Sequence, residues 1–175
     1  LQQLRSGAHG GRTQHYICGL PFLESIERTI SMSEHTFFWF YESPIGTLLL
    51  QSQNGKLTKL VFPEKGQAAP APTEAQKDRA PFEKAMKQLD EYFAGSRKNF
   101  ELELTLKGTD FQKSVWTSLT DIPYGQTVCY SHIAKEIGRP KAVRAVGAAN
   151  GKNPIPIIIP CHRVIGKDGS LTGFG

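Results

Sequence analysis

Three side chains with different reactive groups stand together near the end of the sequence: the thiol of Cys161, the imidazole of His162 and the guanidinium of Arg163. They follow a mostly apolar run, 154–160, that closes with Pro160. A buried strand gains no stability from such an ending, so we interpret the set as a site for chemistry. A thiolate is a strong nucleophile, but a free thiol with a pKa of about 8.5 supplies little of it at neutral pH. A neighbouring base is therefore needed.

Local backbone geometry decides whether His162 can be that base. Successive side chains of a strand point to opposite faces, so Cys161 and His162 cannot share a pocket within a strand. Pro160 favours a break, and a turn over 160–162 would bring the imidazole within hydrogen-bond reach of the thiol. A free cysteine is more often a small buried hydrophobe. The flanking Pro, His and Arg favour the catalytic interpretation of Cys161.

A zinc site is the competing use of cysteine and histidine. Structural zinc sites use closely spaced ligands, such as C-x₂-C. Here the nearest other cysteine, Cys129, lies 32 residues before Cys161. We therefore expect no metal and no cofactor. Cys18 makes the total three, an odd number at long spacings, so we expect no disulfide framework and a reducing, cytoplasmic compartment.

Positive charge gathers in the half of the sequence that holds Cys161. The net charge is +5, and residues 107–175 carry all of it, with nine Lys or Arg against four Asp or Glu. Such an excess either keeps the surface soluble or attracts a phosphate backbone. No apolar run approaches the roughly 20 residues of a membrane span, and residues 1–31 lack the pattern of a secretory signal.

The patterns divide the sequence into three parts. We interpret residues 1–31, which precede Met32, as an extension of unknown role that need not be native. Residues 36–106 predict a small α/β domain: strands over 37–62 with a hairpin turn at Asn54-Gly55, a helix over 82–93, and an alternating strand over 101–106. Between the predicted strands and the predicted helix, residues 66–73 are expected to form a loop.

Residues 107–175 predict a mostly helical, winged-helix-like domain. Thr109 or Asp110 caps a first helix. Ser131 caps a second helix over 133–137, the Gly138-Arg139-Pro140 turn follows, and a third helix spans 141–150. Helix, short glycine-containing turn and helix form the helix-turn-helix pattern of DNA-binding proteins.

The last of these helices offers a smooth face of Ala and Gly around one long cation, Arg144. Close packing on another helix explains small residues equally well. On DNA, they allow close approach, and Arg144 is placed to contact phosphate or to enter the space left by an extruded base. Gly147 costs about 1 kcal/mol of helix stability relative to Ala, which close approach would justify. Tyr130 is either a core tyrosine or a contact, and Asn153 either sets a turn or ties the apolar run to this helix.

The combined motifs resemble those of the O6-alkylguanine-DNA alkyltransferases, also called methylated-DNA–protein-cysteine methyltransferases. The resemblance is carried by Pro160-Cys161-His162-Arg163-Val164 behind Asn153-Pro154-x-Pro156, and by Arg144-Ala145-Val146-Gly147. It extends through Gly108-Thr109-x-Phe111-Gln112, Ile122-Pro123-x-Gly125, Tyr130 and Gly138-Arg139-Pro140. The likeness is strong over 107–175 and weaker over 36–106.

The resemblance implies a single-turnover DNA repair enzyme that acts as a monomer on double-stranded DNA. Cys161, deprotonated through His162 and a water, would take the alkyl group from O6-alkylguanine, and from O4-alkylthymine, irreversibly. The helices would enter the minor groove, Arg144 would replace the flipped nucleotide, Tyr130 would push its phosphate, and Asn153 would link helix and active-site turn. The expected DNA contacts are Tyr130, Ser131, Lys141, Arg144, Ala145, Gly147 and Asn150. The expected alkyl-base pocket is Tyr130, Pro156, Val164 and Phe174.

Two positions depart from the family pattern. The activating network of the family ends in a Glu of a C-terminal helix, and the sequence stops at Gly175 before that helix, so we expect a C-terminally truncated chain. Phe174 stands where a hydroxyl-bearing aromatic is usual. Three alternatives therefore stay open: a non-catalytic lesion-binding protein of the alkyltransferase-like type, a helix-turn-helix regulator, and a fragment inactive without the helix.

Overall fold

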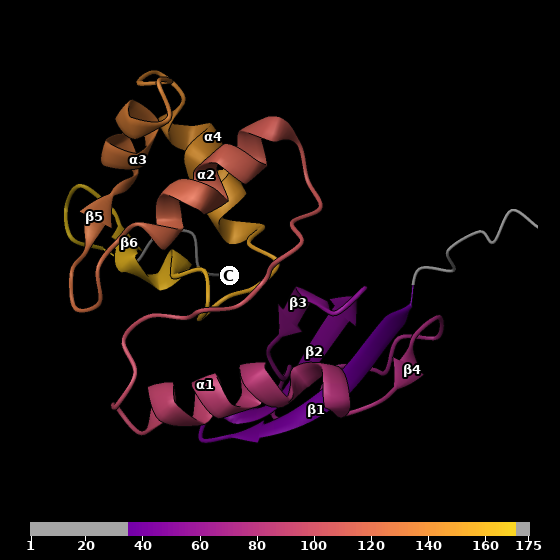
Figure 1. Cartoon of the computed structure of the whole chain (residues 1–175). Coiled ribbons are helices and arrows are strands. Elements are labelled where there is room, and N and C mark those ends of the chain that lie inside the picture. Colours follow the sequence, from indigo (N-terminus) through magenta and orange to yellow (C-terminus); the bar gives the residue numbers. More distant parts are fainter. Residues whose placement is uncertain (1–34, 171–175) are drawn as a thin grey trace, which may run out of the picture. The chain divides into compact units, whose positions relative to one another are not determined.

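The computed structural model describes residues 35–170, which fold into a small sheet with one helix followed by a mostly helical region (Figure 1). The predictions made for the extension 1–31, for Cys18 and for Phe174 lie outside the described residues. Among the described residues, no helix is both long enough and apolar enough to cross a membrane.

The sheet has four strands in the order β3-β2-β1-β4. They are β1 (Thr36–Ser43), β2 (Gly46–Gln53), β3 (Lys56–Val61) and β4 (Gln76–Lys77). The first three form an antiparallel meander, and β4 runs parallel to β1. Asn54 and Gly55 both have positive φ angles, of 51° and 78°, which is the geometry of a tight hairpin turn that Asn-Gly favours. The predicted hairpin is therefore present.

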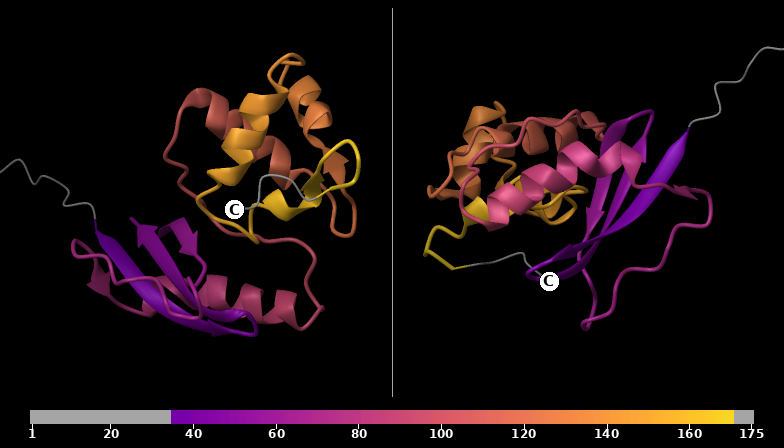
Figure 2. Two further views of the ribbon diagram at one scale, coloured as in Figure 1. Left: turned by 180° about the vertical axis from the view of Figure 1, so that it is seen from behind. Right: turned by 60° about the horizontal axis from the view of Figure 1, so that its bottom comes forward.

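One helix, α1 (Glu83–Phe93), lies across a face of this sheet, preceded by the 3₁₀ turn η1 (Ala80–Phe82) (Figures 1 and 2). Its apolar residues recur at helical spacing, so Phe82, Met86 and Leu89 are buried in one cluster with Leu48 and Leu50 of β2. A hydrogen bond also joins α1 to the sheet: the Tyr41 hydroxyl donates to Asp90 Oδ1 at 2.6 Å. Burial and this carboxylate raise the pKa of Tyr41.

The predicted strand over 101–106 is not formed. Its only ladder contact among the described residues is a bridge between Leu104 and Leu57. At its start, Gln88 of α1 replaces a neighbouring strand: the Gln88 amide donates to the Glu101 carbonyl, and the Glu101 N–H donates to Gln88 Oε1. Since a side chain satisfies this backbone, alternation of apolar residues does not lead to a full strand.

The second region is built from three helices, one 3₁₀ turn and a two-stranded parallel ladder. These are α2 (Asp110–Thr120), β5 (Val128–Cys129), α3 (Tyr130–Glu136), α4 (Val143–Gly151), η2 (Cys161–Arg163) and β6 (Val164–Ile165). A reciprocal capping box of Thr109 and Gln112 starts α2, as the sequence predicts for Thr109. Trp116 then ties α2 to α4, because its indole N–H donates to the Ala149 carbonyl at 2.8 Å.

Two predicted helix starts are displaced. Cys129, not Ser131, is the N-cap residue of α3, so the helix begins at Tyr130. The next helix begins at Val143 rather than at 141, with Ala142 as its N-cap. In neither case does the cap residue's side chain accept a hydrogen bond. The helices α3 and α4 pack on each other, and their starts are not marked by the side-chain caps that the sequence predicts.

Candidate active site

Cys161 sits on a turn that proline residues force on the chain. Pro154, Pro156 and Pro160 remove three backbone donors, so the apolar run cannot act as an ordinary strand. Instead it curls back on itself, and Ile157 takes a left-handed φ of 73°. The run ends in η2, which confirms the predicted turn at Cys161.

Asn153 fastens this turn from inside. Its Nδ2 donates to the Ile159 carbonyl at 2.7 Å, and its Oδ1 accepts from the Ile155 N–H at 3.0 Å. Ile155 and Ile159 are fully buried. The Ile155 N–H depends on this amide for its partner, whereas the Ile159 carbonyl also accepts from the Cys161 N–H at 2.8 Å. The same side chain hydrogen-bonds the Cys161 thiol. Asn153 therefore fixes both the shape of the turn and the environment of the sulfur.

The Cys161 thiol is buried, with 7% of the residue exposed. Burial raises its pKa because a thiolate loses hydration, and the hydrogen bond from Asn153 partly offsets this. The balance keeps the thiol protonated at neutral pH. Its use as a nucleophile thus requires transfer of a proton to a base.

His162 lies next in sequence but does not hydrogen-bond the thiol; among residues 35–170 no such bond joins the two side chains. The histidine is exposed at the surface. Loss of hydration, followed by the charge of Arg163, lowers its pKa. The lowered pKa leaves the imidazole mostly neutral at pH 7, so it can accept a proton. The turn predicted a direct hydrogen bond between the thiol and the imidazole, and within the described residues this bond is not formed.

Asn150 contacts the active-site turn through its side chain, and its position differs from the one predicted. It is 1% exposed, so its side chain is not presented to DNA as the sequence had suggested. Its Nδ2 donates to the Cys161 carbonyl at 3.4 Å, while its Oδ1 is buried without a partner in the described part of the chain. Its place at the end of an Ala- and Gly-rich helix gives no sign of this role.

A cavity of about 460 Å³ opens beside Cys161. Pro156, Asn153 and Asn150 line one part of it, and residues 59–64, from β3 and the segment after it, line another. The Leu60 N–H also donates to the Pro154 carbonyl at 2.9 Å, which joins β3 to the start of the turn. Nothing in the sequence indicated this contribution of 59–64.

The four predicted pocket residues are only partly brought together. Pro156 lines the cavity at Cys161. Val164 is fully buried and pairs with Val128 between β6 and β5, and Tyr130 is half-buried at the start of α3. Neither lines that cavity. Phe174 is outside the described residues.

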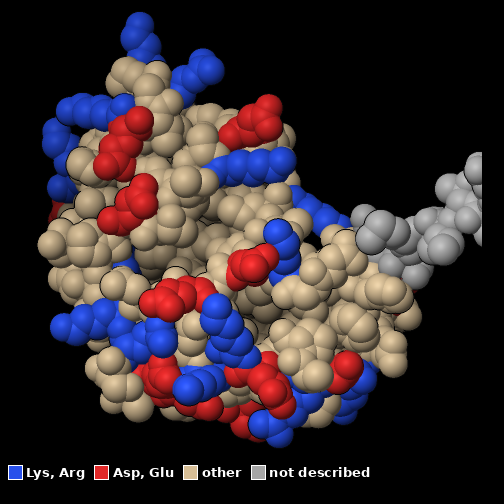
Figure 3. All heavy atoms as spheres, viewed as in Figure 1, with Lys and Arg blue, Asp and Glu red and all other residues tan. Residues whose placement is uncertain are grey.

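The remaining predicted DNA contacts lie on α3, on α4 and between them. Lys141, Arg144 and Ala145 are exposed, whereas Ser131 and Gly147 are half-buried. A methyl group at Gly147 would meet the Tyr130 ring at 3.8 Å, an ordinary contact. Lys and Arg side chains are visible over this helical end of the molecule, with a few acidic groups among them (Figure 3). Within residues 35–170, no group of three or more metal-ligating side chains comes together.

Comparison with known proteins decides the family. Residues 37–106 match the ribonuclease-like domain of 6-O-methylguanine DNA methyltransferase, and residues 110–175 match its DNA binding domain. The chain belongs to this family. The resemblance of its motifs to the alkyltransferases is thereby confirmed.

Relatives at high identity carry the family's two-part fold. The methylated-DNA–protein-cysteine methyltransferase of Methanosarcina acetivorans is 48% identical over 138 residues, which make up 79% of this chain and 88% of the relative. That of Mycobacterium tuberculosis is 52% identical over 134 residues, 77% of this chain and 81% of the relative. The crystal structure of M. tuberculosis OGT in complex with DNA superposes with a TM-score of 0.73 at 49% identity, over 79% of this chain and 84% of that one. The predicted fold class, a small α/β domain followed by a mostly helical one, is confirmed.

Proposed function

We propose that this chain repairs DNA by moving the alkyl group of O6-alkylguanine onto Sγ of Cys161. The observation that carries the proposal is the buried thiol of Cys161 on a turn fixed by Asn153, in a family member whose helical region matches a DNA binding domain. A relative at 49% identity has been crystallised with DNA.

The chemistry is one displacement at carbon. The Cys161 proton passes to neutral His162; because the two side chains are not hydrogen-bonded, a water carries it. The thiolate then attacks the alkyl carbon, the C–S bond forms, the C–O6 bond breaks, and guanine leaves as an anion that takes up a proton. The thioether has no acyl or disulfide bond that water or a thiol readily cleaves. Each molecule therefore reacts once.

The target base has to leave the duplex, because a thiol with 7% residue exposure cannot reach an atom inside the stack. We propose that α3 and α4 enter the minor groove and that Arg144, exposed on α4, fills the vacated space. Tyr130 would act on the neighbouring phosphate. Lys141, Ser131, Ala145 and Gly147 would complete the contact, and the protein would act as a monomer.

Intact-mass measurement tests the transfer. After incubation with a duplex that contains O6-methylguanine, the protein should gain one methylene unit, mapped to Cys161. A Cys161→Ala variant should bind the duplex and gain nothing. Binding without a mass gain in the unaltered chain would instead support a lesion-binding protein. A duplex with O4-methylthymine, whose carbon is likewise bonded to a base oxygen, tests whether the substrate range extends to thymine.

A further inference from the structure

A second cavity borders the active-site turn and has a different character. It has a volume of about 290 Å³. Its polar lining is Lys98, Asn99, Thr120 and Arg163, and its apolar lining is Phe100, Leu102, Leu104, Ile158 and Pro160. Among residues 35–170, no Asp or Glu lines this cavity, so two cations share a partly enclosed space without a carboxylate from that part of the chain.

Arg163 is the more unusual of these cations. The residue is only 8% exposed, and arginine is almost never so buried without a charged partner. Its Nη1 donates to the Ile122 carbonyl at 2.6 Å, and its guanidinium carbon lies 5.5 Å from the centre of the Tyr124 ring. Within the described residues it forms no ion pair. A guanidinium has five N–H donors and stays charged at all relevant pH, so most of its binding capacity is unused.

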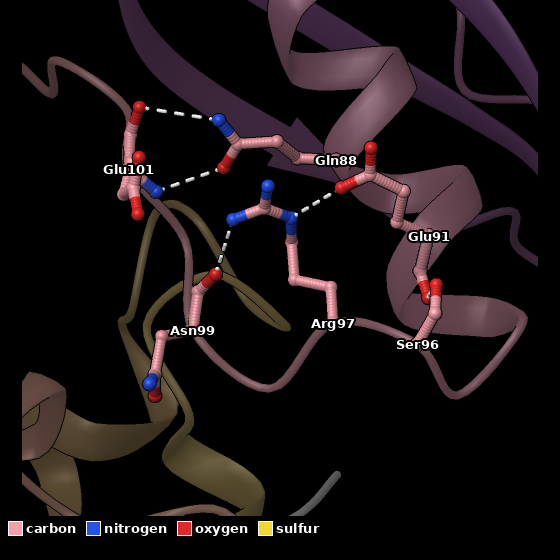
Figure 4. Close-up of polar contacts among 6 residues, drawn as sticks. All are labelled: Gln88, Glu91, Ser96, Arg97, Asn99 and Glu101. Atoms are coloured by element: carbon pink, nitrogen blue, oxygen red, sulfur yellow. Dashed lines mark hydrogen bonds and ion pairs between the residues drawn. The ribbon is translucent and has the colours of Figure 1, made fainter.

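Lys98, Asn99 and Phe100 contribute to the lining from the loop that follows α1, which hydrogen bonds tie to that helix (Figure 4). Arg97 donates from Nε to Glu91 Oε2 at 2.6 Å and from Nη1 to the Asn99 carbonyl at 2.8 Å. Two hydrogen bonds between Gln88 and the Glu101 backbone fix the loop's far end. The charge of Arg97 is thus neutralised inside the protein, whereas that of Lys98 is not.

Lys98 completes the pair of cations. Its Nζ lies 6.0 Å from the centre of the Tyr124 ring, so Lys98 and Arg163 flank the same aromatic side chain. Lys98 forms no ion pair within residues 35–170. Asn99 also lines the cavity, and within the described residues its hydrogen bond from Arg97 uses the backbone carbonyl, which leaves the side-chain amide available as a donor.

We propose that this cavity is a binding site for a phosphate group, held between Arg163 and Lys98. A phosphate offers the multiple acceptor oxygens that a guanidinium fork recognises. The apolar walls leave room for the organic part of a phosphate ester, such as a nucleotide. Because Pro160 lines the cavity, the occupant touches the turn that carries Cys161. The proposal does not depend on alkyl transfer.

Titration followed by NMR tests this site. Inorganic phosphate, adenosine monophosphate and a lesion-free duplex are added separately at constant ionic strength, with chloride as reference, and the Arg163 Nε–H and Tyr124 ring signals are followed. We expect saturable shifts of both signals. Lys98→Ala should weaken binding about tenfold, since it removes one charge-assisted contact. Lys87→Ala, an exposed lysine of α1 outside this cavity, is the matched control and should leave binding unchanged.

The three ligands separate the possible sources of the phosphate. Tighter binding of the nucleotide than of inorganic phosphate supports an ester that uses the apolar walls, and shifts with the duplex alone support a DNA phosphate. The proposal is wrong if none of the ligands gives saturable shifts, or if Lys98→Ala and Lys87→Ala bind equally well. Arg163 is left unaltered in these tests because its burial makes a folding defect the first effect of any substitution there.

Discussion

Replacing Asn153 by alanine should damage the active-site turn in two separable ways. The substitution leaves the Ile155 N–H without a partner and takes one of two donors from the Ile159 carbonyl, which keeps the Cys161 N–H; both residues are fully buried. Each buried backbone group left without a partner costs about 1–3 kcal/mol. One such group, the Ile155 N–H, and one lost hydrogen bond to Ile159 are involved, so we expect the free energy of unfolding to fall by about 2 kcal/mol.

The same substitution should also slow the chemistry. Asn153 lowers the pKa of Cys161 through a hydrogen bond, and its loss leaves only the backbone N–H groups of Cys161 and His162 to oppose burial, so the pKa rises further. Each unit of that rise reduces the thiolate fraction at neutral pH about tenfold. The pH–rate profile of alkyl transfer from free O6-benzylguanine, which needs no DNA, should shift to higher pH.

Urea unfolding and the pH–rate profile together provide the assay, with Lys152→Ala as a control in the exposed residue next to Asn153. The control should change neither measurement. If Asn153→Ala unfolds within about 0.5 kcal/mol of the unaltered chain, which is the usual range for surface substitutions, the turn does not depend on this amide. An unchanged pH–rate profile would refute its action on the thiol.

Three further outcomes are expected. Arg144→Ala should slow repair of duplex DNA far more than reaction with free O6-benzylguanine, and equal losses on the two substrates would rule out a role in extruding the base. In urea unfolding, Asn150→Leu should cost no more than about 1 kcal/mol, because it removes an acceptor that has no partner and one long hydrogen bond to the Cys161 carbonyl, which keeps the Val164 N–H as donor. Asn150→Asp should cost about 3 kcal/mol or more because it buries a charge; similar losses for both would contradict this. Folding raises the pKa of the Cys161 thiol. The protonated thiol therefore contributes to stability in full below about pH 8.5, and this contribution is lost as pH rises through the folded-state pKa. Cys161→Ala should reduce this loss of stability at alkaline pH, as measured by unfolding free energies from pH 7 to 10.

Local signals in the sequence were sufficient wherever the neighbouring residues alone decide the structure. The Asn54-Gly55 turn needs two positive φ angles, which this dipeptide supplies. Thr109 and Gln112 form a capping box from residues three apart. The turn at Cys161 follows from Pro160. In each case the competing conformations are excluded by the residues themselves.

The sequence was insufficient where a distant side chain decides the outcome. Residues 101–106 alternate like a strand, but Gln88 from α1 takes the backbone partners at Glu101. Asn150 belongs to a helix with small exposed residues, yet tertiary packing turns it inward beneath Cys161. The wall contributed by residues 59–64 depends on the hydrogen bond between Leu60 and Pro154. Because the contacting residues are far apart in the sequence, the spacing of apolar residues gives no sign of these contacts.

Ile157 limits how this turn can change in evolution or in the laboratory. A left-handed backbone is strained for a β-branched residue by about 1–2 kcal/mol, and glycine would relieve that strain. However, the side chain is 7% exposed, and deleting such a buried aliphatic group costs about 2–5 kcal/mol. Asparagine tolerates the backbone but would bury an amide. No single substitution improves this position, so a more stable variant would have to rebuild Ile157 together with the residues packed around it.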